Sequence, residues 1–213
     1  MRRLFGLILG ILCLTTSAPA QVQELFSEYL QVFRPKGTFP SRLVKATPPP
    51  TTRWKNYGGE GEGFRLRLPD NAEVDTRPDG SRRLQAVLAG STAKPLPTLR
   101  VDLFDPQEGD PEEVDGEYVT ELVTEYPKQA FGGKFVVTDS GHVLLGRKWN
   151  VAVIGGEYVG GGRQTYRMQA TLLSPSRQVY LTFDCAAAGW EQYQDVLARI
   201  LLSLEGPARK DKR

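Results

Sequence analysis

The sequence predicts a domain of the α+β class, in which a series of strands is combined with two amphipathic helices. The strands are predicted from segments that alternate apolar and polar residues with period two, at 64–69, 98–104, 163–173 and 178–185. The helices are predicted from apolar residues that recur at helical spacing, at 109–126 and 190–204. No internal repeat is evident, so we expect one domain, over residues 60–206.

The first twenty residues, 1–20, are predicted to be a signal peptide. They contain two N-terminal arginines, an apolar stretch over 4–14 and the small-residue sequence "APA". This apolar stretch is shorter than the roughly 20 residues of a membrane span. We therefore expect cleavage between Ala20 and Gln21, no transmembrane span after cleavage, and an exported protein (periplasmic or secreted, or lumenal in a photosynthetic organism).

Signal-peptide removal leaves a nearly neutral chain. The full sequence has 27 Lys and Arg against 25 Asp and Glu, and the loss of Arg2 and Arg3 leaves 25 of each. The basic C-terminal tail, 207–213, carries four of these cations, so the remainder is slightly acidic. This charge distribution argues against nucleic acid as a partner.

Cysteine usage also changes on cleavage. Lipidation at Cys13 is an alternative to simple export, but Leu12 occupies the position where a small residue is preferred. Once Cys13 is removed, Cys185 is the only remaining cysteine, and an intramolecular disulfide cannot form. We therefore expect the core to supply the stability of the exported protein.

A short amphipathic helix is predicted at 21–34, followed by a proline-rich linker at 35–59. The helix places apolar residues at helical spacing and ends at Arg34-Pro35, because a residue before proline avoids the helical region. It is too short to be stable alone. Docking on its own domain is the favoured interpretation, and docking on a partner or a membrane surface are the alternatives.

The first half of the domain is predicted to contain strands and one helix. Phe64, Leu66 and Leu68 alternate with two arginines, a turn follows at 77–83, and further strands are expected at 84–90 and 98–104. The helix is expected to begin at an N-cap, Asp110, with Pro111 at the first helical position and Glu113 completing a capping box. It is expected to end near Pro127, before Gly132 and Gly133.

The glycine-rich stretch "GGEYVGGGRQTYRMQA", 155–170, has two possible interpretations. A phosphate-binding loop needs a helix directly after the glycines. The residues after Gly162 instead have period two, and neither common phosphate-binding signature fits. The stretch therefore predicts a β-hairpin. Strands are expected at 134–138, 142–156, 163–173 and 178–185, followed by the helix at 190–204, which Gly206-Pro207 terminates.

Two phrases resemble the PsbP-like family, which includes the extrinsic P subunit of photosystem II and exported bacterial relatives. "GFRLRLPDNAEV" is similar to the opening strand and turn of that family, and "VYLTFDCAAAGWEQYQDVLARILLSLEG" to its closing strand and helix, although Leu204 replaces a common Phe. The resemblance covers 60–206 and implies an α/β/α sandwich with an antiparallel sheet packed between helices. It brings no catalytic residues. The histidine-based metal sites of photosynthetic members have no counterpart beyond His142, the one histidine.

Candidate catalytic groups are few. His142 follows Asp139 and Ser140 in "TDSGHV", but neighbours this close in sequence rarely form a triad, and Asp-Ser-Gly is typical of a turn. Cys185 lies in the inward register of its strand and is expected to be a small core residue and not a nucleophile. One histidine and one cysteine cannot build a zinc site, so no metal or cofactor is expected.

Arginines form the main candidate site. Arg65, Arg67, Arg100 and Arg167 all lie at outward positions of predicted strands. If the sheet is a single layer, they form a surface for an anionic ligand or an acidic partner, with Asp102, Thr171 and Thr182 nearby. Cross-strand ion pairing or cover by a helix is the alternative. Asp102 and Asp184 are possible paired carboxylates.

These observations predict a non-catalytic exported module that binds or supports a partner, an unidentified protein or a small anionic ligand, at the cell envelope. Two alternatives stay open. One is a small hydrolase that uses carboxylates in a groove, and the other is a carrier of an apolar small molecule, which needs a large lined pocket. The lack of a convincing nucleophile, metal set or phosphate loop in the sequence favours the binding module.

Overall fold

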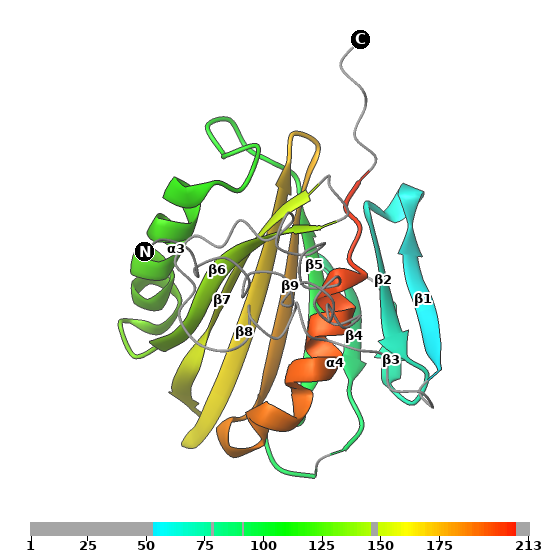
Figure 1. Ribbon diagram of the computed structural model, residues 1–213, viewed down its shortest axis with the longest axis vertical. Helices are drawn as coiled ribbons and strands as arrows, with labels where there is room; N and C mark the ends of the chain where they lie inside the picture. The colour runs from blue at the N-terminus through cyan, green and yellow to red at the C-terminus, as the bar shows by residue number, and fades with distance from the viewer. Residues whose placement is uncertain (1–52, 78, 91, 146–148, 208–213) are drawn as a thin grey trace, which may run out of the picture.

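The computed structural model describes residues 53–77, 79–90, 92–145 and 149–207. In this part of the chain, a seven-stranded sheet and a two-stranded sheet are combined with two α-helices (Figure 1). The α+β class and the antiparallel sheet between helices are thereby confirmed. The predicted signal peptide, the helix at 21–34, the linker up to residue 52 and the tail from residue 208 lie outside the described residues.

The elements follow one another with short connections. In chain order they are β1 (Trp54–Gly59), η1 (Glu60–Glu62), β2 (Phe64–Pro69), β3 (Glu73–Asp75), β4 (Arg82–Val87), β5 (Thr98–Phe104), α3 (Gly116–Phe131), β6 (Val136–Leu145), β7 (Trp149–Gly160), β8 (Arg163–Ser174), β9 (Arg177–Ala186), η2 (Ala187–Gly189) and α4 (Trp190–Leu202). The large sheet has the order β3-β4-β5-β9-β8-β7-β6, and every neighbouring pair is antiparallel.

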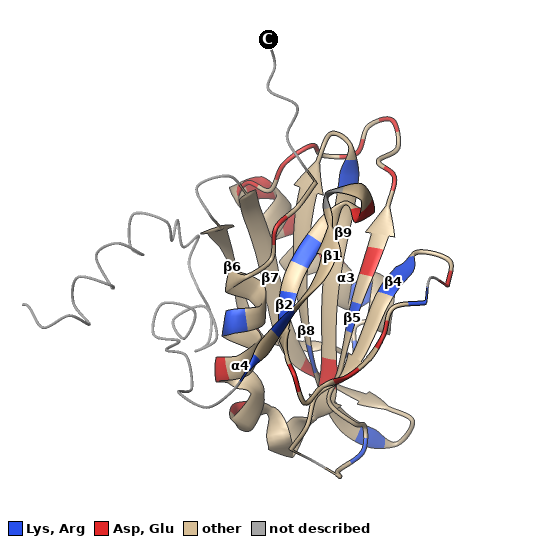
Figure 2. Ribbon diagram, turned by 90° about the vertical axis from the view of Figure 1, so that its right-hand side faces the viewer, with Lys and Arg blue, Asp and Glu red and all other residues tan. Residues whose placement is uncertain are grey.

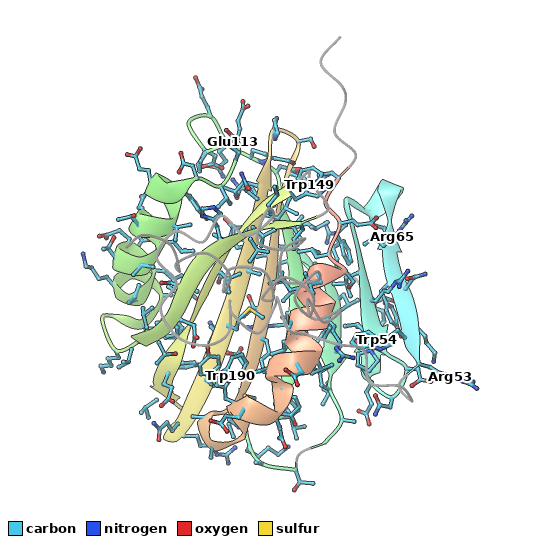
Figure 3. All side chains as sticks on the ribbon, viewed as in Figure 1. Arg53, Trp54, Arg65, Glu113, Trp149 and Trp190 are labelled. Carbon is cyan, nitrogen blue, oxygen red and sulfur yellow. The ribbon has the colours of Figure 1, made fainter. Side chains whose placement is uncertain are left out.

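One face of the large sheet carries the main hydrophobic core. Alternate residues of the strands, such as Val101, Met168 and Phe183, are fully buried against α4 and β2. The ring of Trp190, at the start of α4, stacks on Tyr166 with 3.8 Å between centroids. Trp149 lies toward the other end of the molecule from Trp190 (Figure 3) and also belongs to this core.

The two-stranded sheet closes this face beside α4 (Figure 1). Phe64, Leu66 and Leu68 point into the core, as predicted, but β2 pairs with β1 and not with the large sheet. Strand β1 lies within the range predicted as linker, 35–59. The sequence does not reveal this strand because exposure does not alternate along it: Trp54 and Tyr57 pack against the core, whereas Lys55, Asn56 and Gly58 are exposed.

Helix α3 packs on the opposite face, over β6 and β7, and its start differs from the prediction. Asp115, and not Asp110, is the N-cap, and its carboxylate accepts a 2.8 Å hydrogen bond from the Tyr118 amide. The carboxylate of Asp110 instead accepts hydrogen bonds from the Gln107 amide and from Gln178. This tertiary contact with Gln178 cannot be read from local spacing, so the capping-box pattern misplaced the start of the helix.

The end of α3 also extends beyond the prediction. Pro127 lies inside the helix, where its buried ring packs against the domain and offsets the missing backbone hydrogen bond. Gly132 then terminates the helix in the left-handed conformation, with φ of 57°. The predicted end near Pro127 is therefore wrong, and the helix continues to Phe131, directly before the two glycines.

The glycine-rich stretch is a β-hairpin, as predicted. Gly160 pairs with Arg163, and the two loop residues, Gly161 and Gly162, have φ of 57° and 73°. Two consecutive positive φ values are characteristic of the tight type I′ hairpin turn. No helix follows the glycines, so this stretch cannot present helix amides to a phosphate.

The predicted turn at Asp139 to Gly141 is wrong, because these residues lie inside β6 and pair with β7. Gly155 lies opposite Asp139, and a Cβ atom on Gly155 would come within 2.2 Å of the Tyr166 hydroxyl. The absence of a side chain at Gly155 lets Tyr166 reach Asp139, which accepts its hydrogen bond at 2.8 Å. Strand pairing here overrides the local turn preference of the sequence.

Candidate functional site

The four predicted arginines lie on two different sheets, so the structure does not bring them together. Arg65 and Arg67 are on β2, whereas Arg100 is on β5 and Arg167 on β8. Arg65 lies on the opposite side of the molecule from α3 (Figure 3). The expectation of one single-layer arginine surface is therefore corrected: β2 is not a strand of the large sheet. Any role of these arginines in binding an anion or a partner stays a prediction.

Arg65 and Arg67 interact with the end of α4 and with β1. The Arg65 backbone exchanges two hydrogen bonds with Glu205, and the two side chains form an exposed ion pair at 3.5 Å. The Arg67 amide donates to the Ser203 hydroxyl, and its guanidinium donates to Asn56. In Figure 2 this hairpin faces the viewer, and the basic positions of β2 are blue.

Arg100 and Arg167 both bind Asp184, on the sheet face that α3 partly covers. Arg167 forms a bidentate pair with this carboxylate, with N···O distances of 2.6 and 2.8 Å, and Arg100 donates at 3.2 Å. The Asp184 side chain is only 15% exposed. Two of the predicted arginines therefore already hold an internal carboxylate.

Aromatic rings from α3 and β7 cover the Arg167 guanidinium. The rings of Phe131 and Tyr158 have centroids 5.3 and 5.4 Å from it. Burial by itself disfavours the charged form, but hydrogen bonds to and attraction by Asp184 outweigh it and raise the pKa of Arg167. The pair holds the Arg167 guanidinium in place on the sheet, and the contact of Phe131 with it attaches the C-terminal end of α3.

Beside this contact, α3 and the sheet line a groove of about 960 Å³. Its floor consists of side chains that project from β5, β8 and β9 on the face opposite the main core: Asp102, Phe104, Gln169, Gln178, Tyr180 and Thr182. One wall is a single face of α3, formed by Tyr118, Glu121, Leu122, Glu125, Tyr126 and Gln129. The connection from β5 to α3 closes one end with Asp105, Gln107, Asp110 and Pro111.

The floor is polar although it is largely covered. Gln178, Thr182 and Gln169 are 7%, 6% and 8% exposed, respectively. Gln169 lies directly opposite Thr182 across the β8–β9 pair. Buried polar groups are normally hydrogen-bonded, and Gln178 follows this rule by donating to Asp110 at 2.8 Å. The Thr182 hydroxyl has no hydrogen-bond partner among the described residues.

The groove lining is acidic. It contains five carboxylates, from Asp102, Asp105, Asp110, Glu121 and Glu125, and its described residues include no Lys or Arg. Asp105 forms an ion pair with Arg177, and Glu125 forms one with Lys128. Such a lining suits cationic ligands better than anionic ones.

His142 does not form a triad with Asp139 and Ser140. Asp139 contacts Tyr166 on the main-core side, whereas His142 is three residues further along the strand and projects from the opposite face. The His142 side chain is 7% exposed, and its Nδ1 atom has no hydrogen-bond partner in the described part of the chain. Burial lowers the pKa of His142, although the nearby Asp115 partly opposes the shift.

Cys185 is a buried free cysteine of the main core, as predicted. Burial raises the pKa of its thiol to about 12, with the neighbouring charge of Asp184 adding to the shift. Because the thiolate is the reactive form, the thiol is inert at neutral pH in the folded protein.

Asp102 and Asp184 are not a catalytic pair. Asp102 lies opposite Tyr180 on β9, four residues from Asp184, which corresponds to roughly 13 Å along a strand. Asp184 is also occupied by two guanidinium groups. The described residues contain no group of three or more His, Cys, Asp or Glu that could hold a metal ion.

The sequence pointed to Asp102 and Thr182 but missed most of the groove. Gln169, Gln178 and Tyr180 were not singled out, although a signal existed. The outward positions of β8 and β9 carry neutral Gln, Thr and Tyr where an open surface would carry Lys or Glu, and this pattern is typical of a partly covered polar face. The α3 wall has no comparable signal, because the helical spacing of Tyr118 and Leu122 indicates a buried helix face and not a groove beside it.

The comparisons with known proteins agree on the fold. No family model matches the chain, and no curated protein is significantly similar to it in sequence. Among solved structures, LpqN of Mycobacterium tuberculosis, described as involved in cell envelope biogenesis, has a TM-score of 0.54 at 17% identity, covering 74% of this chain and 92% of LpqN. Cyanobacterial PsbP of Synechocystis has a TM-score of 0.55 at 6% identity, covering 75% and 97%. The domain therefore has a PsbP-like fold.

Proposed function

We propose that this protein is a non-catalytic exported module, which binds a partner at the cell envelope through the groove between α3 and the sheet. The observation that carries the proposal is the groove itself, a large depression lined by carboxylates, amides and aromatic rings, whose floor includes a hydroxyl, that of Thr182, without a partner among the described residues. Such a site is built for binding, because its polar groups are left for a ligand to satisfy.

The location is supported by the sequence and by one structural neighbour. The N-terminal residues have the organisation of a signal peptide. LpqN, which shares the fold, is described as involved in cell envelope biogenesis. No helix in the described part of the chain has the length and apolar character needed to span a bilayer. Sequencing of the mature N-terminus should give Gln21, and an intact Met1 species as the sole product would contradict export.

The groove can be tested by blocking it. We expect a double variant, Glu121→Trp with Gln129→Trp, to block the groove from its α3 side, because both positions line the groove and are exposed. The matched control, Glu117→Trp with Thr124→Trp, puts the same rings on exposed positions of α3 outside the groove. Native mass spectrometry of proteins purified from the exported fraction should show a partner on the wild type and control but not on the blocked variant.

Two results would contradict the proposal. A partner that stays bound to the blocked variant would place the binding site elsewhere. Hydrolytic turnover that survives repurification and disappears in the blocked variant would favour the hydrolase alternative. A carrier of apolar molecules is not favoured, because an apolar ligand in this groove would also bury carboxylates that it cannot pair with.

A further inference from the structure

We infer that the groove takes an extended polypeptide segment that bears lysine or arginine side chains, supplied by a partner protein. This inference rests on the proposed binding function and specifies the chemistry of the partner. It follows from three properties of the groove: its charge, its unsatisfied floor and its length.

The charge of the groove is only partly balanced within the protein. Asp105 and Glu125 have cationic partners, Arg177 and Lys128. Asp102, Asp110 and Glu121 also line the groove and form no ion pair with any described residue. A concave surface with several uncompensated carboxylates concentrates cations and repels anions.

The floor of the groove also carries polar side chains that lack good hydrogen-bond partners within the described part of the chain. The Thr182 hydroxyl is in a side chain that is 6% exposed, faces the groove and has no hydrogen-bond partner among the described residues. Gln169, directly opposite, is 8% exposed, and its amide makes only a long 3.4 Å contact with Thr171. Backbone N–H and C=O groups of a bound polypeptide would satisfy both residues.

The length of the groove favours a chain over a compact ion. The α3 wall runs from Tyr118 to Gln129, which corresponds to about 16 Å of helix. About five residues of an extended chain span this distance. The rings of Tyr118, Tyr126 and Tyr180 line the groove and can pack against lysine or arginine stems and attract their charges.

The test uses the mature chain from Gln21 onward and two labelled hexapeptides, one alternating Lys with Thr and one alternating Glu with Thr. Fluorescence anisotropy should show binding of the lysine peptide, weakening as salt is raised, and no binding of the glutamate peptide. The variant Asp110→Asn with Glu121→Gln, which removes two groove charges, should lower the affinity on the order of tenfold. The control variant Asp70→Asn with Glu73→Gln, at exposed positions outside the groove, should bind as the wild type does.

Other occupants give different results. If the lysine peptide binds only after deletion of 208–213, the groove holds the basic tail of its own chain and the inference is wrong. Spermine binding tighter than the peptide would identify a small polyamine instead. If neither hexapeptide binds while the groove-blocked variant still loses its partner, the binding function stands and the cationic-segment inference fails. Thermal unfolding of each variant checks that the groove is still formed.

Discussion

The two faces of the large sheet are built from the same strands but differ in what covers them. On the α4 face, side chains such as Leu181 and Phe183 are completely buried in a continuous apolar core. On the α3 face, the intervening residues Thr182 and Asp184 are also covered, yet they are polar. The helix on that face contacts the sheet at β6 and β7 and through the Arg167 pair, and leaves the groove open.

The apolar face is therefore expected to matter more for stability, and the polar face more for binding. The apolar face supplies most of the burial that stabilises the domain, whose Cys185 is free. The polar face contributes less burial and keeps hydrogen-bonding groups available. Substitutions on the two faces should therefore have effects of different size, even at adjacent positions of one strand.

The largest contrast is expected between neighbouring residues of β9. Phe183→Ala should lower the free energy of unfolding by about 4 kcal/mol, because it removes a fully buried ring and leaves a cavity. Thr182→Ala should cost less than about 1 kcal/mol, because the hydroxyl has no partner among the described residues to lose and only a small apolar area disappears. Urea denaturation of the two variants measures both values, and similar losses would refute the division between the faces.

The next largest effect is expected at Asp184, which holds the arginine that Phe131 of α3 covers. Asp184→Asn should cost about 3 kcal/mol, because Arg100 and Arg167 would then share a covered site without their carboxylate. Hydrogen exchange should become faster in the second half of α3, whose Phe131 covers Arg167. The control Asp75→Asn removes an exposed ion pair with Arg77 and should leave unfolding unchanged. Unchanged exchange in α3 would show that the pair does not hold the helix.

The smallest effect is a pH dependence on the α3 face. Because burial lowers the pKa of His142 below its ordinary value of 6.5, the folded protein favours the neutral ring. The stability from this preference is present above pH 6.5 and is lost as the pH falls below it, since the unfolded chain then binds the extra proton. His142→Gln should reduce the loss of melting temperature between pH 7.5 and 5.5. An identical loss in the variant and the wild type would contradict this assignment.

The sequence predicted the elements well where alternation or helical spacing was local. Strands β2, β5, β8 and β9, the hairpin at Gly161-Gly162 and the final helix were all found. It failed where partners distant in the chain decide the conformation. Asp139 lies in a strand because β7 pairs with it, and Asp110 is not an N-cap because Gln178 binds its carboxylate.

By itself, the sequence determined the α+β class, the apolar face of the sheet and the buried position of Cys185, because period and hydrophobicity are local properties of the chain. Only the tertiary structure decided which outward residues meet. It placed Arg65 and Arg67 on a different sheet from Arg100 and Arg167, and it brought the latter two to Asp184. It also formed an acidic groove from residues more than 70 positions apart, such as Asp102 and Thr182. The physical reason is that outward side chains make no hydrophobic pattern of their own, so strand order and helix placement set their neighbours.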